Sequence, residues 1–174
     1  MAIDKAREHL AQFGAQDRIL EFETSSATVE LAADAAGVEP ARIAKTLSFD
    51  VLGGTVLVVC AGDVKVKSGK FKAYFGVKPK MLEFALVEPR VGHAVGGVCP
   101  FGVNPDVKIY LDSSLKRFET VYPACGSDNS AIELTCSELQ EYSRALDWVD
   151  VCEVREALVS AQFFHFYIEY ANNC

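Results

Sequence analysis

A glycine-rich loop at residues 92–103 gives the strongest chemical signal in the sequence. It reads GHAVGGVCPFGV, with four glycines and one proline in twelve residues. The pair Gly96 and Gly97 allows positive φ and a close approach of the backbone to a ligand, while Pro100 favours a turn. Backbone N–H groups in such a turn can bind a carboxylate, a phosphate or a developing oxyanion. The loop therefore predicts an anion-binding site, with a tight structural connection as the alternative.

Two side chains inside this loop could add chemistry of their own. Cys99 could act as a nucleophile if a nearby base generates its thiolate, and His93 is the only histidine in this region. His93 could instead serve as a general base, or it could only hydrogen-bond the loop. The other five cysteines are scattered, without a CxxC pair or a histidine-containing metal pattern. We expect them to be reduced and mostly buried, and we expect no metal and no cofactor.

Lys45 is the third chemical candidate. It ends the apolar run ARIAK and directly precedes TLSF, so we expect it where a short helix that opens at Pro40 meets a strand. A side chain at such a junction can point into a pocket beside the sheet. A partly desolvated lysine there could bind phosphate, orient a carbonyl or have a lowered pKa. The alternative is a surface lysine whose apolar stem packs on the fold.

Charge is distributed unevenly along the chain. The net charge of −7 argues against non-specific coating of nucleic acid, which needs clustered cations. Yet residues 63–80 carry six lysines against one acid. This cluster could steer a phosphate-bearing substrate toward a site, or it could be a solvated helix face.

The remaining pattern predicts the elements that must position these residues. Half of the 174 residues are hydrophobic, enough for one domain with a substantial core. Helical spacing and capping residues, with Thr28 and Ser137 as N-caps, predict helices at residues 3–13, 31–36, 40–45, 68–75, 83–87 and 137–146. β-rich runs predict strands at residues 18–23, 46–51, 55–60, 107–111, 119–122 and 131–134. Residues 52–54 should join the second and third strands as a hairpin.

The expected fold class is α+β: a single domain over residues 1–174, in which helices cover a mixed, mostly antiparallel sheet. Residues 153–174 form an aromatic C-terminal extension. We expect it to pack as a helix on the domain's own core, with a second subunit as the alternative. No apolar run approaches the roughly 20 residues needed to cross a bilayer, and the start of the chain is charged and amphipathic. We therefore expect a cytoplasmic protein without membrane contact.

Three segments, in order, resemble the YbaK/ProX-like aminoacyl-tRNA deacylases, relatives of the editing insertion of bacterial prolyl-tRNA synthetases. They are TVELAADAAGVEPARIAKTLSF at residues 28–49, the glycine loop at 92–103, and IYLDSSLKRFETVYPACGSDNSAIELTCSEL at 109–139. The shared pattern is an alanine-rich helix, Gly-Val-x-Pro and Lys-Thr-Leu, followed far downstream by the glycine loop. The likeness runs from about Leu20 to Val151, most of the chain.

This resemblance implies hydrolysis of an amino acid wrongly esterified to the 3′ end of a tRNA. It implies that activity depends on Lys45, and that the backbone amides of Gly96 and Gly97 lie near the scissile carbonyl. Such amides can stabilise the tetrahedral oxyanion, so that water or a group on the substrate attacks without a protein nucleophile. The further substrate contacts that we expect are Phe22, Thr28, Thr46, His93, Cys99, Gly126 and Ser127. The tRNA should approach along Lys65, Lys67, Lys70 and Lys72.

Departures from the family pattern bear on the substrate. His93 stands where several relatives have tyrosine, Cys99 where they have serine, and residues 124–128 lack the two basic residues of some members. These changes alter the polarity of the pocket, and we expect a small amino acid of the alanine, serine, threonine or cysteine class. The alternative function is a non-catalytic module that binds an aminoacyl-tRNA, a nucleotide or a synthetase in the same pocket. The expected partners are the tRNA acceptor end and, as a further candidate, a synthetase; monomer and homodimer both remain open.

Overall fold

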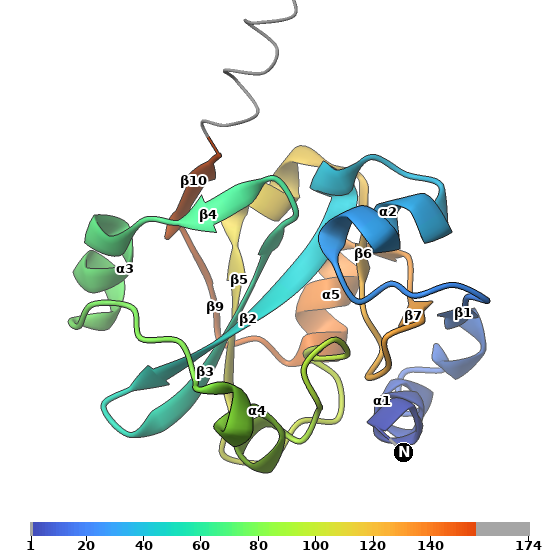
Figure 1. Ribbon diagram of the computed structural model, residues 1–174, viewed down its shortest axis with the longest axis horizontal. Helices are drawn as coiled ribbons and strands as arrows, with labels where there is room; N and C mark the ends of the chain where they lie inside the picture. Colours follow the sequence, from blue (N-terminus) through green and yellow to red (C-terminus); the bar gives the residue numbers. More distant parts are fainter. Residues whose placement is uncertain (1, 156–174) are drawn as a thin grey trace, which may run out of the picture.

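The computed structural model describes residues 2–155, and Figure 1 labels most of its elements. Its α-helices are α1 (Ala2–Ala11), α2 (Val29–Ala36), α3 (Ser68–Phe75), α4 (Phe84–Val91) and α5 (Cys136–Ser143). Its short 3-10 helices are η1 (Gln16–Arg18), η2 (Pro40–Arg42) and η3 (Ser113–Arg117). Its strands are β1 (Leu20–Glu21), β2 (Ile43–Val51), β3 (Gly54–Ala61), β4 (Val64–Val66), β5 (Lys108–Asp112), β6 (Thr120–Pro123), β7 (Ser130–Ala131), β8 (Leu134–Thr135), β9 (Asp147–Val149) and β10 (Cys152–Val154). Most of the predicted aromatic extension, residues 156–174, lies outside the described residues.

The main sheet has six strands in the order β8-β6-β2-β3-β5-β9. β2 and β3 form an antiparallel hairpin, whereas β2–β6, β3–β5 and β5–β9 are parallel. Two further antiparallel pairs, β1–β7 and β10–β4, form small separate sheets. The predicted α+β class with a mixed sheet is confirmed. Four of the seven ladders in the described residues are antiparallel, but within the main sheet three of the five ladders are parallel.

The hairpin turn shows how local sequence sets the register of the sheet. Val51 pairs with Gly54, so Leu52 and Gly53 alone form a two-residue turn. Both residues have positive φ, 52° and 85°, as a type I′ turn requires. Gly53 N also donates to the Asp50 carboxylate at 3.0 Å. The predicted hairpin is confirmed, and it pairs every residue of β3 with a residue of β2.

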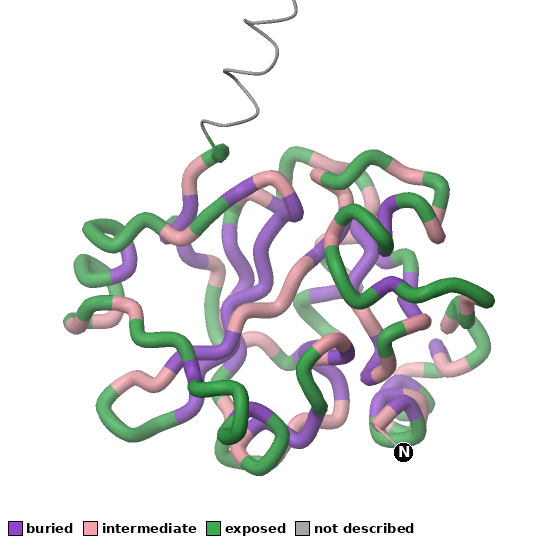
Figure 2. Tube along the Cα trace, viewed as in Figure 1, coloured by how far each residue is buried: buried purple, intermediate pink, exposed green. Residues whose placement is uncertain are grey.

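β3 is the buried centre of the fold. Residues 57–61 are each 0% exposed, and Figure 2 shows the buried chain gathered in the middle of the sheet. A strand that is covered on both faces carries a continuous apolar run instead of an alternating one, which explains its sequence, GTVLVVCA. Leu111 of β5, Leu134 of β8 and Leu139 of α5 join the same buried cluster. One core therefore supports both halves of the chain.

Local sequence signals set the N-caps of both α2 and α5, but the cap of α5 is not the predicted residue. The Thr28 hydroxyl accepts a backbone N–H of α2 at 3.2 Å, and Gly37 adopts the left-handed conformation that ends this helix, as predicted. The N-cap of α5 is Thr135 and not the predicted Ser137. The hydroxyl of Thr135 accepts from the backbone N–H of Glu138, and the Glu138 carboxylate accepts from the backbone N–H of Thr135. This reciprocal capping box starts the helix two residues early.

Strand pairing corrects the prediction for Lys45. The helix expected at residues 40–45 ends as η2 at Arg42, because Ile43 already pairs with Tyr122 of β6. Lys45 therefore lies inside β2, opposite Cys60 of β3, and not at a junction between a helix and a strand.

Pairing also divides the strand predicted at residues 131–134. Ala131 of β7 pairs with Leu20 of β1, whereas Leu134 of β8 pairs with Val121 of β6. β4, β9 and β10 were not predicted, because each has only three residues and pairs with a strand far away in the sequence. Within residues 2–155, no helix combines the length and the apolar character that crossing a membrane would require.

Candidate active site

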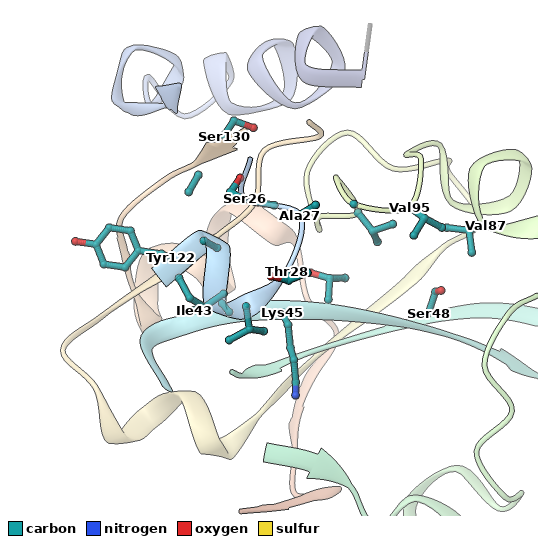
Figure 3. A pocket seen from close by; sticks show the side chains of 18 of the residues that line it. Ser26, Ala27, Thr28, Ile43, Lys45, Ser48, Val87, Val95, Tyr122 and Ser130 are labelled. Carbon is teal, nitrogen blue, oxygen red and sulfur yellow. The ribbon is translucent and has the colours of Figure 1, made fainter. Parts of the chain in front are cut away.

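A cavity of about 370 Å³ opens beside the edge of β2. Its walls come from residues 26–28 before α2, the first half of β2, α4 with the segment before it, the glycine loop, β6 and β7. Figure 3 shows Tyr122 toward one end of the cavity, and Val95 and Val87 toward the other. The cavity thus joins segments from both halves of the chain.

The cavity exists because one stretch of the β2 edge has no strand beside it. β6 pairs with β2 only at the first two residues of β2. Farther along, Leu82 N donates to Ser48 O at 3.0 Å, and Asp50 N donates to Lys80 O at 2.8 Å. Alternation along the strand directs the backbone N–H and C=O of Thr46 to this same edge, in the gap between the two partners. In residues 2–155, no hydrogen bond outside the helices and ladders involves these groups, so β2 offers the cavity a donor and an acceptor.

Two hydroxyl groups in the cavity wall are also unpaired. The side-chain oxygens of Ser26 and Thr46 are buried, and neither has a hydrogen-bond partner in the described part of the chain. Leaving a buried hydroxyl unpaired costs about 1–3 kcal/mol, so both groups favour a polar ligand in the cavity. Thr46 was predicted as a substrate contact, whereas Ser26 was missed. The sequence signal that could have found it is the polar run SSAT before α2.

Gly96 and Gly97 face different spaces. Gly96 has φ +97° and lines the cavity. Gly97 N donates to Ala94 O at 3.1 Å, which closes the turn and occupies its N–H group. Gly97 lies instead against Gly126, on the other side of the loop. Of the two predicted amides, only that of Gly96 belongs to a residue of the cavity wall, and the prediction for Gly97 does not fit.

The ammonium of Lys45 points away from the unpaired hydroxyls. Lys45 contributes to the cavity wall, but Figure 3 shows its side chain leaving β2 on the side opposite Ser26 and Thr28. There Lys45 Nζ donates to the backbone carbonyl of Val64 in β4. Burial lowers the pKa of Lys45 below its ordinary value of 10.5. Lys45 and Gly96 therefore both line the cavity, but the ammonium of Lys45 and the Gly96 amide do not point at one centre.

His93 and Cys99 lie inside the core, where no substrate reaches them. Both side chains are 0% exposed, and neither lines the cavity. His93 Nε2 lies 2.6 Å from Phe101 O, a distance at which it must donate a proton, so it cannot take the proton of the Cys99 thiol 3.5 Å away. Burial raises the pKa of Cys99 to about 12 and lowers that of His93. The predicted substrate contacts at both residues are therefore wrong, and the thiolate pair has no geometric basis.

The sequence pattern of the aminoacyl-tRNA editing domain matches residues 23–142 of this chain. That span holds every wall of the cavity. The chain belongs to the aminoacyl-tRNA editing domain family. This confirms the resemblance seen in the sequence, and with it the assignment as a hydrolase of the ester bond in aminoacyl-tRNA.

Relatives of this editing domain include proteins with and without assigned activity. The uncharacterized protein YwhH of Bacillus subtilis (strain 168) is 52% identical over 154 residues, which cover 88% of this chain and 98% of that protein. EbsC of Enterococcus faecalis (strain ATCC 700802 / V583), provisionally named a Cys-tRNA(Pro)/Cys-tRNA(Cys) deacylase, is 28% identical over 109 residues, 62% of this chain and 66% of EbsC. Among solved structures, a proposed trans-editing enzyme for prolyl-tRNA synthetase superposes with a TM-score of 0.79 at 27% identity, covering 87% of this chain and 97% of that one.

Some of the other residues predicted to contact substrate line the cavity of this editing domain, and some lie outside it. Thr28 lies at the cavity rim as the cap of α2. Phe22 does not line the cavity; its backbone bonds Asn129, with Phe22 N donating to Asn129 O at 2.7 Å. Gly126 and Ser127 line a second hollow of about 490 Å³ next to the N-terminus of α1, together with Gly97. The structure therefore gathers Lys45, Thr46, Thr28 and Gly96 in one wall and leaves the rest outside it.

The predicted path for tRNA is partly neutralised. Lys67 lies 3.4 Å from the Glu153 carboxylate, and Lys70 lies 3.0 Å from that of Asp150. Four other lysines of the cluster are exposed and form no ion pair within residues 2–155: Lys65, Lys72, Lys78 and Lys80. In the same residues, no group of three or more His, Cys, Asp or Glu side chains could hold a metal ion.

Proposed function

We propose that the chain is a trans-editing deacylase for a mischarged tRNA that carries a small amino acid, of the alanine, serine, threonine or cysteine class. The observation that carries this proposal is a cavity of about 370 Å³ beside an unpaired stretch of strand edge. Its volume is near the lower end of the range for ligand pockets, roughly 300–1,000 Å³. The space therefore favours a small aminoacyl group over a large one.

The polar groups of the cavity suit an aminoacyl ester. The backbone of Thr46 offers a C=O to an ammonium group and an N–H to a carbonyl oxygen, as a strand edge does for a peptide. The hydroxyls of Ser26 and Thr46 can pair with the substrate, which removes the cost of leaving them buried and unpaired. Apolar side chains such as Ala32 and Val87 complete the wall. Such walls discriminate by only about 1–3 kcal/mol per methylene, so polar contacts must supply part of the selectivity.

The chemistry that we propose needs no protein nucleophile. Ester hydrolysis passes through a tetrahedral oxyanion, which the Gly96 amide and the free N–H of Thr46 can stabilise. Water attacks the carbonyl carbon, the bond from that carbon to the ribose oxygen breaks, and the ribose oxygen takes up a proton as the free amino acid leaves. Lys45 supports the site by tying β2 to β4 next to Thr46, through its bond to Val64. A direct contact with substrate requires the ammonium to leave that bond.

The names of two relatives support the substrate class and the partners. EbsC is provisionally a deacylase of Cys-tRNA, and the solved relative is a proposed trans-editing enzyme for prolyl-tRNA synthetase. We extend to this chain a small amino acid on tRNA as substrate and a synthetase as candidate partner. A cytoplasmic location, where charged tRNA is found, is part of the same proposal.

A panel of tRNAs mischarged with alanine, serine, threonine or cysteine tests the proposal, with a correctly charged tRNA as reference. We expect release of one or two of these amino acids well above the spontaneous rate, and a loss of that activity in Thr46→Val. Leu146→Ala is the matched control, because Leu146 is exposed and lies outside the cavity. Spontaneous rates throughout the panel would contradict the proposal.

The second candidate function is a binding module without turnover. The observation that favours it is the bond from Lys45 to Val64, which holds the one ammonium of the cavity wall away from its polar groups. A non-catalytic module would bind the same aminoacyl-tRNAs, protect their esters and release no amino acid. Turnover by substoichiometric protein excludes it.

A further inference from the structure

The mouth of the cavity carries an exposed apolar rim. Among the side chains that line the cavity, Phe84, Met81 and Val95 are 80%, 56% and 52% exposed. Phe84 begins α4, Met81 lies in the segment before it, and Val95 lies in the glycine loop. The other exposed lining residues are Ala27 and Thr28, before α2. The cavity therefore meets solvent between α2 on one side and this rim on the other.

Helix periodicity directs Phe84 toward the cavity and not away from the fold. Val87 and Val91 are buried, and they follow Phe84 at positions i+3 and i+7 of α4. The three side chains share one face of the helix, which packs on the core at its far end and overhangs the cavity at its start. A large aromatic side chain that continues a buried face into solvent marks a contact surface.

We propose that this rim holds the unpaired terminal nucleoside of the tRNA, with its base stacked on Phe84. The inference rests on the proposed function, because the ester joins the amino acid directly to the terminal ribose. An aminoacyl group in the cavity therefore puts that nucleoside at the mouth. Among the exposed lining residues of the described chain, Phe84 has the one aromatic ring, and base–aromatic stacking accepts any base because every base has a π face.

Charges beside the rim fit a short single strand. Lys78 and Lys80 precede the rim in the chain, are exposed, and form no ion pair within residues 2–155. They can contact the phosphates next to a stacked base. Glu83 and Glu88 of α4 are exposed as well, so the surface suits a strand end and not a long duplex. We therefore expect the tRNA to approach along the segment before α4, and not along Lys70, which is already paired.

The test uses the full chain and an uncharged RNA oligonucleotide with 2-aminopurine as its 3′-terminal base. Stacking quenches 2-aminopurine fluorescence, so a titration gives both the affinity and the contact with the terminal base. We expect quenching with the wild type and with Phe84→Tyr, and about 5- to 100-fold weaker binding with Phe84→Ala. Leu146→Ala, which changes an exposed leucine outside the cavity, should bind as the wild type does. No ester is present, so the readout is independent of hydrolysis.

Each other result counts against the proposal or against the function on which it rests. Equal affinity and equal quenching by Phe84→Ala would overturn the stacking, as would a wild type that deacylates tRNA without quenching the probe. If Phe84→Ala alters self-association or synthetase binding and leaves RNA binding intact, the rim is a protein contact and the proposal fails. Quenching that depends on Phe84, without hydrolysis of any mischarged tRNA, would support base stacking at the rim and contradict the proposed deacylase function.

Discussion

Gly97 and Gly126 touch through their backbones, in a contact that leaves no room for a side chain. A Cβ built on Gly97 would lie 2.7 Å from both the carbonyl carbon and the oxygen of Gly126. A Cβ built on Gly126 would lie 2.5 Å from the carbonyl oxygen of Ala2 in α1. The glycine loop is thus seated on rigid backbone, and this seat fixes where Gly96 enters the cavity.

Gly97→Ala should destabilise the protein and weaken catalysis together. The new methyl group meets backbone that cannot rotate away, an overpacking that costs about 1–3 kcal/mol. The displaced loop should also carry Gly96 away from the ester. Urea unfolding and deacylation rates measure the two effects. Gly69→Ala in α3 is the control: nothing lies within 4 Å of its Cβ, and alanine favours a helix by about 0.5–1 kcal/mol. If Gly97→Ala had the stability and activity of the wild type, the contact with Gly126 would not fix the position of the glycine loop.

Ser26→Ala and Thr46→Val should impair activity without impairing the fold. The hydroxyls have no protein partner in the described residues, so their removal should not lower the free energy of unfolding. Each variant loses one hydrogen bond to substrate, and we expect kcat/KM to fall on the order of 10-fold. Steady-state deacylation with the preferred mischarged tRNA, alongside urea unfolding, gives both numbers.

Thr55→Val supplies the opposite pattern as a control for the hydroxyls. Thr55 is 3% exposed, and its hydroxyl accepts from Arg90 Nε at 2.9 Å outside the cavity. Removing it should cost about 1–3 kcal/mol of stability, because it leaves the guanidinium with an unmet hydrogen bond. Its kcat/KM should match that of the wild type. Equal losses of activity in Thr55→Val and Thr46→Val would remove the case for a substrate contact at Thr46.

Cys99 should be chemically silent in the folded protein. With its pKa raised to about 12, the thiol has almost no thiolate at neutral pH, and its burial excludes reagents. Iodoacetamide labelling followed by mass spectrometry should modify Cys99 only after unfolding. Cys99→Ser should keep kcat/KM within about threefold of the wild type, since it leaves the cavity unchanged. Fast labelling of Cys99 with a matching loss of activity would instead support Cys99 as the nucleophile.

Lys45 should make the free energy of unfolding depend on pH. Its native pKa is lowered by burial, so the native state releases this proton before the unfolded state does as pH rises. Below the native pKa both states are charged, and the desolvation cost is fully present. That cost declines as pH rises through the native pKa toward 10.5, the ordinary value. The stability of the wild type relative to Lys45→Met should therefore increase from pH 7 to pH 10, as measured by urea unfolding. A pH-independent difference would contradict this.

Activity of the Lys45 variants separates support from direct contact. If Lys45 holds Thr46 through β4, Lys45→Met should lower kcat/KM on the order of 100-fold, the usual cost of a misplaced site. Lys45→Arg, which can still reach the Val64 carbonyl, should recover much of that loss. A direct role for the ammonium predicts that arginine does not substitute and that the loss follows the titration of the lysine.

The sequence by itself determined the elements whose hydrogen bonds join near neighbours. Thr28 caps α2, Leu52 and Gly53 form the turn, and Gly76 ends α3, all as the local pattern indicates. Each of these depends on residues within about four positions, so a short window contains the whole cause. The family resemblance also lies in the sequence, and from it we expected Lys45, Thr46, Gly96 and Gly97 around one pocket.

Only the tertiary structure decided which groups of that wall are free to act. Lys45 belongs to a strand because β3 and β6 pair with its neighbours, and its ammonium faces β4 as a result. Gly97 donates its backbone N–H within the turn, and the side-chain oxygen of Ser26 is buried in the cavity wall without a partner in the described residues. The cavity is a gap in strand pairing, and such a gap depends on where distant partners stop. No stretch of sequence contains both the strand and the place where its neighbours end.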